Sequence, residues 1–117
     1  MADDTKTKFE AGDDEFGSFG IIAAAGEARS DAFRALDAAK AGDFAQADEL
    51  IAEAEEHLRL AHVAQTELLA KEASGEHVPV DIMIMHAQDH LMSATLAREL
   101  IAEIIELRRE RAGEESR

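Results

Sequence analysis

The fold is decided by residues 82–112, which read IMIMHAQDHLMSATLARELIAEIIELRRERA. Placing residues about 100° apart, as in an α-helix, sorts the apolar side chains into two stripes on nearly opposite sides. The first stripe holds Ile84, Ala87, Leu91, Ala94, Ile101 and Ile105, and the second holds Ile82, Met85, Met92, Leu96, Leu100 and Leu107. A helix in a solitary three-helix bundle buries one stripe. The second stripe predicts a subunit interface, the alternative being a monomer with an uncommonly large exposed apolar surface.

Two further helical segments precede this one. Residues 18–41 carry small apolar side chains at helical spacing and stop at Gly42. Residues 44–73 repeat the pattern in steps of three and four. The short Gly-Asp connection between the two segments leaves room only for an antiparallel pair. The sequence thus predicts an all-α fold, an antiparallel three-helix bundle.

Capping residues are expected at the ends of these segments. Asp43 precedes the second helix, and Gln46 three residues later completes a capping box. Asp81 is placed to cap the third helix, and Gly75 to end the second.

The ends of the chain lack apolar periodicity. Residues 1–16 read as a disordered acidic tail, residues 17–112 as the folded domain, and residues 113–117 as a frayed C-terminus.

Composition excludes several functional classes. The chain of 117 residues fits one domain and has no Cys, so it carries neither disulfides nor a thiolate site. Its net charge of −14 argues against nucleic acid and against direct membrane insertion or binding. No apolar run is long enough to cross a membrane and no signal-peptide pattern is present, so a cytoplasmic location is expected.

The candidate site is the cluster of His86, Asp89 and His90 in the third helix. The two histidines share a helix face, whereas Asp89 points into the second apolar stripe. If that stripe is an oligomer seam, copies of Asp89 approach each other, and three carboxylates would suit a divalent cation such as Mg²⁺. Alternatively, Asp89 bonds a neighbour or lies at the edge of the stripe.

The histidines allow several interpretations. A zinc protease motif is excluded because Ala87 stands where HExxH requires Glu. A di-iron site is excluded because neither histidine has a Glu three residues before it. A nucleophilic histidine and a purely structural one both remain possible from the residues alone.

Four segments within residues 20–107 form a recognisable set: IIAAAGEARSDAFRAL, AGDFAQADELIAEA, AHVAQTELLAKEASGE and MHAQDHLMSATLARELIAEIIEL. Together they resemble the lactose/cellobiose-type enzyme IIA family of the phosphoenolpyruvate-dependent sugar phosphotransferase system. The motif HAQDHLM, which follows GE-x-V, is the most specific part.

The resemblance implies a homotrimer of three-helix subunits with His86 as the phosphoryl acceptor and donor. The phosphoryl group would come from the histidine-containing phosphocarrier protein and pass to a cysteine of a IIB component. A disaccharide of the lactose/cellobiose/chitobiose class is then phosphorylated without direct sugar binding by this subunit. Asp89 would be the metal position on the trimer axis. We expect His90 to support His86, and Gln65, a polar residue in an apolar seam, to line the phosphoryl site, with a core hydrogen bond as its alternative.

Two rival functions remain at this stage. The segment AGDFAQADELIAEAEEHL also resembles a tetratricopeptide-type helix, which would make the chain an interaction module, but no 34-residue repeat accompanies it. A regulatory homologue would keep the fold and the phosphorylated histidine yet signal rather than transport.

Overall fold

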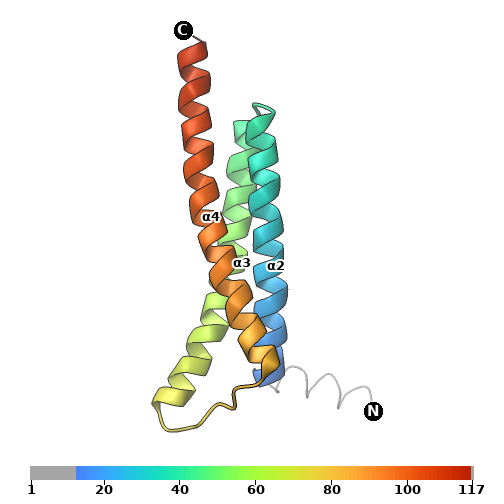
Figure 1. Ribbon diagram of the computed structural model, residues 1–117, viewed down its shortest axis with the longest axis vertical. Helices are drawn as coiled ribbons and strands as arrows, with labels where there is room; N and C mark the ends of the chain where they lie inside the picture. The colour runs from blue at the N-terminus through green and yellow to red at the C-terminus, as the bar shows by residue number, and fades with distance from the viewer. Residues whose placement is uncertain (1–12, 117) are drawn as a thin grey trace, which may run out of the picture.

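Three α-helices make up the protein in a computed structural model that describes residues 13–116, with side chains from residue 17 onward. They are α2 (Asp13–Lys40), α3 (Phe44–Ala73) and α4 (Ile82–Glu115), and the described residues contain no strand. Figure 1 shows α2 and α4 running in the same direction, with α3 antiparallel to both. The predicted all-α three-helix bundle is confirmed.

The predicted caps form as expected. The Asp43 carboxylate accepts a hydrogen bond from the backbone N–H of Gln46 at 3.1 Å, and Asp81 accepts one from Ile84 at 2.9 Å. Each bond satisfies an amide that the first helical turn leaves without a partner. Gly75 comes directly after Ser74, the C-cap of α3, and has φ +100°, a left-handed conformation that favours glycine.

Two predicted helix ends are wrong. The first helix begins at Asp13 rather than at residue 18, so residues 13–16 belong to α2 and not to the tail. Acidic residues near a helix N-terminus are favoured by its dipole, which outweighs their lack of apolar periodicity. The third helix continues to Glu115 instead of ending at residue 112, and an Arg111–Glu115 pair at 3.4 Å supports its last turn. Residues 1–12 and Arg117 lie outside the described part of the chain.

The core is built mainly from alanine. Buried alanines from all three helices meet with a few larger side chains such as Ile21, Leu58 and Leu91. A second cluster nearer the α2–α3 turn contains Leu50, Ile101 and further alanines. Small side chains let the helix axes approach closely, so even this thin core excludes water.

The two stripes of the third helix separate cleanly by burial. The first stripe lies in the core, with Ala87, Leu91, Ala94, Ile101 and Ile105 buried and Ile84 packed against them. Every residue of the second stripe is exposed, from 55% for Leu100 to 81% for Ile82. We call this second set the outer stripe. A single chain therefore leaves a mainly apolar strip of α4, interrupted by Asp89, without a partner among its described residues.

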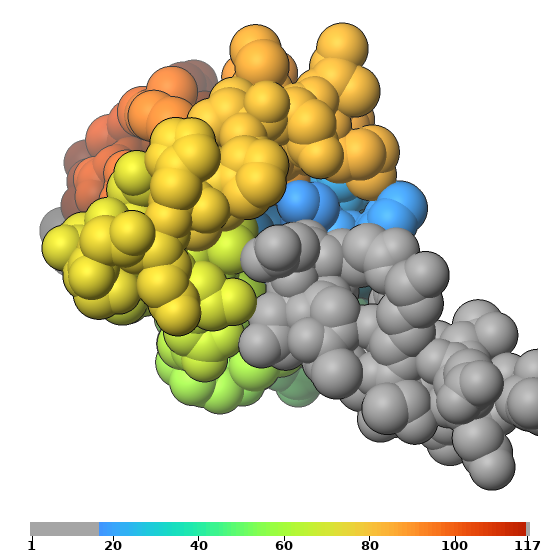
Figure 2. All heavy atoms as spheres, turned by 90° about the horizontal axis from the view of Figure 1, so that it is seen from below, coloured from blue at the N-terminus to red at the C-terminus, as the bar shows by residue number. Residues whose placement is uncertain are grey.

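The connection between α3 and α4 is held by Glu72. Its carboxylate accepts the backbone N–H of Val78 at 2.8 Å and contacts Nδ1 of His77 at 3.2 Å. The hydrogen bond from Val78, followed by that from His77, lowers the pKa of Glu72 below its usual value of 4.5. This connection and the first turns of α4 form the end of the bundle seen in Figure 2.

Within residues 13–116, no helix is both long and apolar enough to span a bilayer.

Candidate phosphoryl-transfer site

His86 lies on the second turn of α4, on a side of the helix that the bundle leaves open. The Asp81 cap fixes the start of the helix, and the burial of Ala87 fixes its rotation. His86 therefore projects beside the core, its side chain is exposed, and it makes no hydrogen bond within the described part of the chain. An imidazole in this state can offer either ring nitrogen to an incoming group.

His90 stands one turn further along the same face. Its ring meets that of His86 edge-on, with centroids 4.5 Å apart and planes inclined by 76°. His90 is half-buried, so its packing limits the rotation of the more exposed His86 ring. The predicted pairing of the two histidines on one face is confirmed as geometry.

Asp89 is exposed within the outer stripe. It lies between Met85 and Met92 along that strip and forms no hydrogen bond or ion pair with any described residue. The alternative in which a neighbouring side chain satisfies Asp89 does not occur in the single chain. Its carboxylate is instead surrounded by apolar side chains that would be covered on association.

Gln65 is not placed at His86 within one chain. Its side-chain amide donates a hydrogen bond to the side-chain carbonyl of Gln88, and both residues are partly buried between α3 and α4. Gln88 follows His86 by two residues, so the two project about 160° apart around α4. The structure thus shows the alternative that the sequence left open, a hydrogen bond at the edge of the core.

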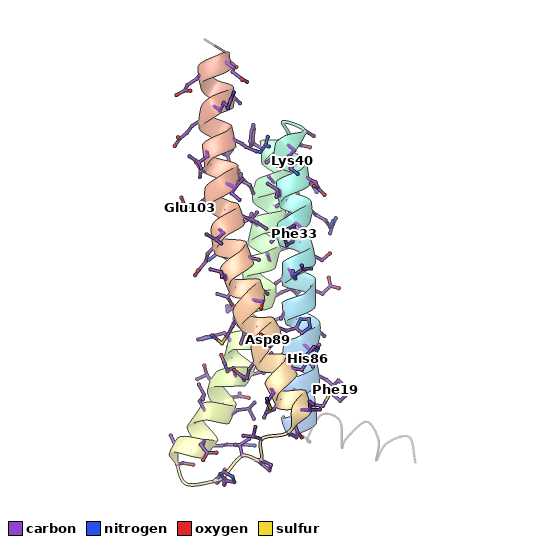
Figure 3. The ribbon with its side chains drawn as sticks, in the orientation of Figure 1. Phe19, Phe33, Lys40, His86, Asp89 and Glu103 are labelled. Carbon is purple, nitrogen blue, oxygen red and sulfur yellow. The ribbon has the colours of Figure 1, made fainter. Side chains whose placement is uncertain are left out.

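Apolar side chains accompany the histidines at this end of the bundle. Figure 3 labels Phe19 on α2 and His86 on α4 at the same end, and Phe19 is 48% exposed. Met85, next to His86, is also exposed. Exposed aromatic and methionine side chains around a reactive group are typical of a surface that docks other proteins.

One buried carboxylate was not anticipated. Asp31 of α2 has only 4% of its side chain exposed, and its oxygens contact His57 of α3 at 3.2 Å and Arg34 at 3.3 Å. A polar residue on the apolar face of the first helix, next to Ala32, was the available signal. Asp31 links α2 to α3 on the side away from the outer stripe, so we assign it to the fold.

A metal site within the single chain would need several ligating side chains close together. Among residues 13–116, no three His, Asp or Glu side chains converge as a metal site would require. Asp89 offers carboxylate oxygens of the kind that hard divalent cations prefer, and it has no competing partner among the described residues. The residues fit such an ion only if other copies of Asp89 complete the ligand set.

Comparison with known proteins bears on this arrangement. The family of lactose/cellobiose-specific IIA subunits of the sugar phosphotransferase system (PTS) matches residues 17–109. This chain belongs to that family. It is 51% identical over 89 residues to the lactose-specific EIIA component of Lactococcus lactis, covering 76% of this chain and 85% of the relative. The corresponding protein of Streptococcus mutans is 48% identical, with coverage of 76% and 86%.

Solved structures of IIA proteins share the fold. The cellobiose-specific enzyme IIA of Bacillus anthracis superposes with a TM-score of 0.82 at 43% identity, covering 85% of this chain and 91% of that one. The chitobiose IIA of Escherichia coli, solved in complex with HPr, gives a TM-score of 0.72 at 43% identity, with coverage of 82% and 93%. The protein is therefore a PTS IIA component, and the interaction-module alternative is not needed.

Proposed function

We propose that this PTS IIA component is a phosphohistidine carrier and that His86 takes and gives the phosphoryl group. The observation that carries the proposal is the state of His86, an exposed imidazole without hydrogen bonds, beside a second histidine and exposed apolar side chains. No other described histidine combines these features, since His57 and His77 are engaged by carboxylates and His62 lacks a neighbouring ring.

The chemistry proposed is two successive transfers. A neutral ring nitrogen of His86 attacks the phosphorus of a phosphohistidine on HPr, and the nitrogen–phosphorus bond to HPr breaks as the new one forms. A cysteine thiolate of the IIB component then attacks the same phosphorus and restores neutral His86. The solved HPr complex of the related chitobiose protein supports HPr as the donor.

Both protein partners, HPr and the IIB component, would dock on the surface around His86. Phe19, which is exposed at the same end of the bundle as His86, offers apolar surface to these partners. The sugar stays with other components of the system. Because the similar proteins are named for lactose, cellobiose and chitobiose, we propose a disaccharide of this class as the final acceptor.

We propose that the active form is a homotrimer in which the outer stripe of each subunit forms the interface with the others. Covering this strip would remove apolar side chains that the single chain leaves exposed, with Leu96 and Leu100 both more than half exposed. Three copies of Asp89 would then meet near the axis, and together they would hold a divalent cation such as Mg²⁺, which prefers oxygen ligands. Such an ion supplies positive charge that offsets the repulsion of the three carboxylates.

Phosphate transfer from phosphoenolpyruvate through the two general PTS proteins tests the assignment. His86→Gln should abolish acid-labile phosphate on this chain, and His90→Gln should keep it, with unchanged helix content in both variants. Labelling that persists in His86→Gln and disappears in His90→Gln would contradict the assignment of His86.

A further inference from the structure

Charged side chains of opposite sign border the outer stripe in the C-terminal half of α4. Counting about 100° per residue from Leu107 in that stripe, Arg111 lies about 40° to one side and Arg108 about 100° to the same side. Glu110 and Glu106 lie about 60° and 100° to the other side. The exposed strip therefore has one basic flank and one acidic flank, in a chain whose net charge is −14.

These charges are only partly paired among the described residues. Arg108 and Glu110 form no hydrogen bond or ion pair with any described residue, and both are exposed. Arg111 contacts only Glu115, at 3.4 Å, in a pair whose side chains are 80% and 69% exposed. Exposed pairs of this kind contribute little to stability, so they exchange readily for better partners.

Glu106 has one carboxylate oxygen that can accept a further hydrogen bond. Arg109 is anchored to Asp48 of α3 at 2.6 Å, and its Nε donates to Oε2 of Glu106 at 3.3 Å. Oε1 of Glu106 accepts no hydrogen bond from the described residues. The carboxylate is thus oriented from the α3 side while one oxygen remains available at the border of the outer stripe.

The arrangement of the flanks decides how copies of α4 can meet. When helices pair in parallel around a common axis, the basic flank of one copy faces the acidic flank of the next. In an antiparallel pair, flanks of the same sign would face each other and repel. Figure 3 shows α4, with Glu103 labelled, running along one edge of the bundle beyond the end of α3 and α2, where another α4 can approach.

We propose that Arg111 of each copy forms an ion pair with Glu106 of the next copy. This inference rests on the trimer proposed above, whose threefold axis already makes the α4 helices parallel, and adds its polar contacts. The two residues differ by five positions, or about 7.5 Å along parallel helices in register, a height that an arginine and a glutamate side chain span together. Closure of the ring repeats the pair at every interface.

Charge exchange tests the pairing by sedimentation equilibrium. Glu106→Arg and Arg111→Glu should each weaken the trimer association constant on the order of tenfold, because every symmetry-related pair becomes a repulsion. The double variant Glu106→Arg/Arg111→Glu should recover most of the loss. Added salt should weaken the wild-type trimer and narrow the difference between variants.

The control separates pairing from net charge. Glu56→Arg makes the same charge change on α3, where Glu56 is an exposed partner of Arg59 away from the outer stripe. Lower net charge alone predicts tighter association for both Glu56→Arg and Glu106→Arg, whereas the ion pair predicts weaker association for Glu106→Arg alone. Glu106→Gln, which does not repel Arg109, should show a smaller loss in the same direction.

Three outcomes are distinguishable. Weakening in both single variants with recovery in the double supports the pair. A wild-type trimer in which Glu106→Arg associates as tightly as Glu56→Arg, or in which the double variant fails to recover, overturns it. A wild-type protein that stays monomeric at every concentration overturns the proposed trimer itself.

Discussion

Truncating Leu96 should dissociate the protein without unfolding it. Leu96 belongs to the outer stripe and is 56% exposed in the single chain, so association can bury about half of its side chain further. Leu96→Ala removes three carbons, worth about 0.8 kcal/mol each when fully buried, or about 1.2 kcal/mol per chain at half that burial. Three chains lose about 3.6 kcal/mol, which weakens the trimer association constant roughly 400-fold.

A matched control exists on another helix. Leu60 of α3 is 49% exposed, close to Leu96, but lies outside the outer stripe. Leu60→Ala removes the same atoms and should leave association unchanged. Sedimentation equilibrium over a wide range of protein concentration measures both variants, and far-UV circular dichroism checks that helix content is kept.

Two results would refute this reasoning. If Leu60→Ala weakens association as much as Leu96→Ala, the interface is not centred on the outer stripe. If neither variant changes the association constant, the exposed strip of α4 is covered by something other than a second copy.

The remaining predictions concern two carboxylates. Chelation of divalent cations should weaken the wild-type trimer near neutral pH. Asp89→Leu should give a trimer that chelator does not affect and that still takes phosphate on His86. Dissociation of the Asp89→Leu variant would refute the metal assignment. Because the folded-state pKa of Glu72 lies below 4.5, its stabilising contribution is present above that pH and is lost as the pH falls through the lower, folded value. The backbone amide resonance of Val78 should therefore titrate below pH 4.5, and in Glu72→Gln, where the amide oxygen still accepts the bond, it should not.

Much of the fold follows from local patterns in the sequence. The caps at Asp43 and Asp81, the turn at Gly75 and the burial of one stripe of α4 were all predictable because each depends on residues within a few positions of one another. The N-terminal extension of α2 was missed because acidic residues such as Asp13 carry no apolar periodicity, although they suit the start of a helix.

Contacts between helices were harder to predict. The periodicity of α3 placed Gln65 on its inner side, but a helical wheel does not say which side of α4 it meets. It meets Gln88, on the side remote from His86. Likewise, the partner of Asp31 is His57, 26 residues away, and nothing in the local pattern of either helix predicts that pair.

The position of His86 on α4 is limited by its neighbours, because one side of the helix packs in the core and another lies in the outer stripe. Ala87, about 100° further round, must enter the core, and Asp89 lies in the strip that the proposed trimer would cover. A phosphoryl acceptor in either sector would be closed to protein partners, whereas the flank between them is a sector that the proposed trimer would leave open. The spacing of these three residues is therefore under joint constraint. A one-residue insertion between them would turn every later side chain of α4 by about 100°. It would then move either the core residues out of the core or the Asp89 carboxylate out of the outer stripe.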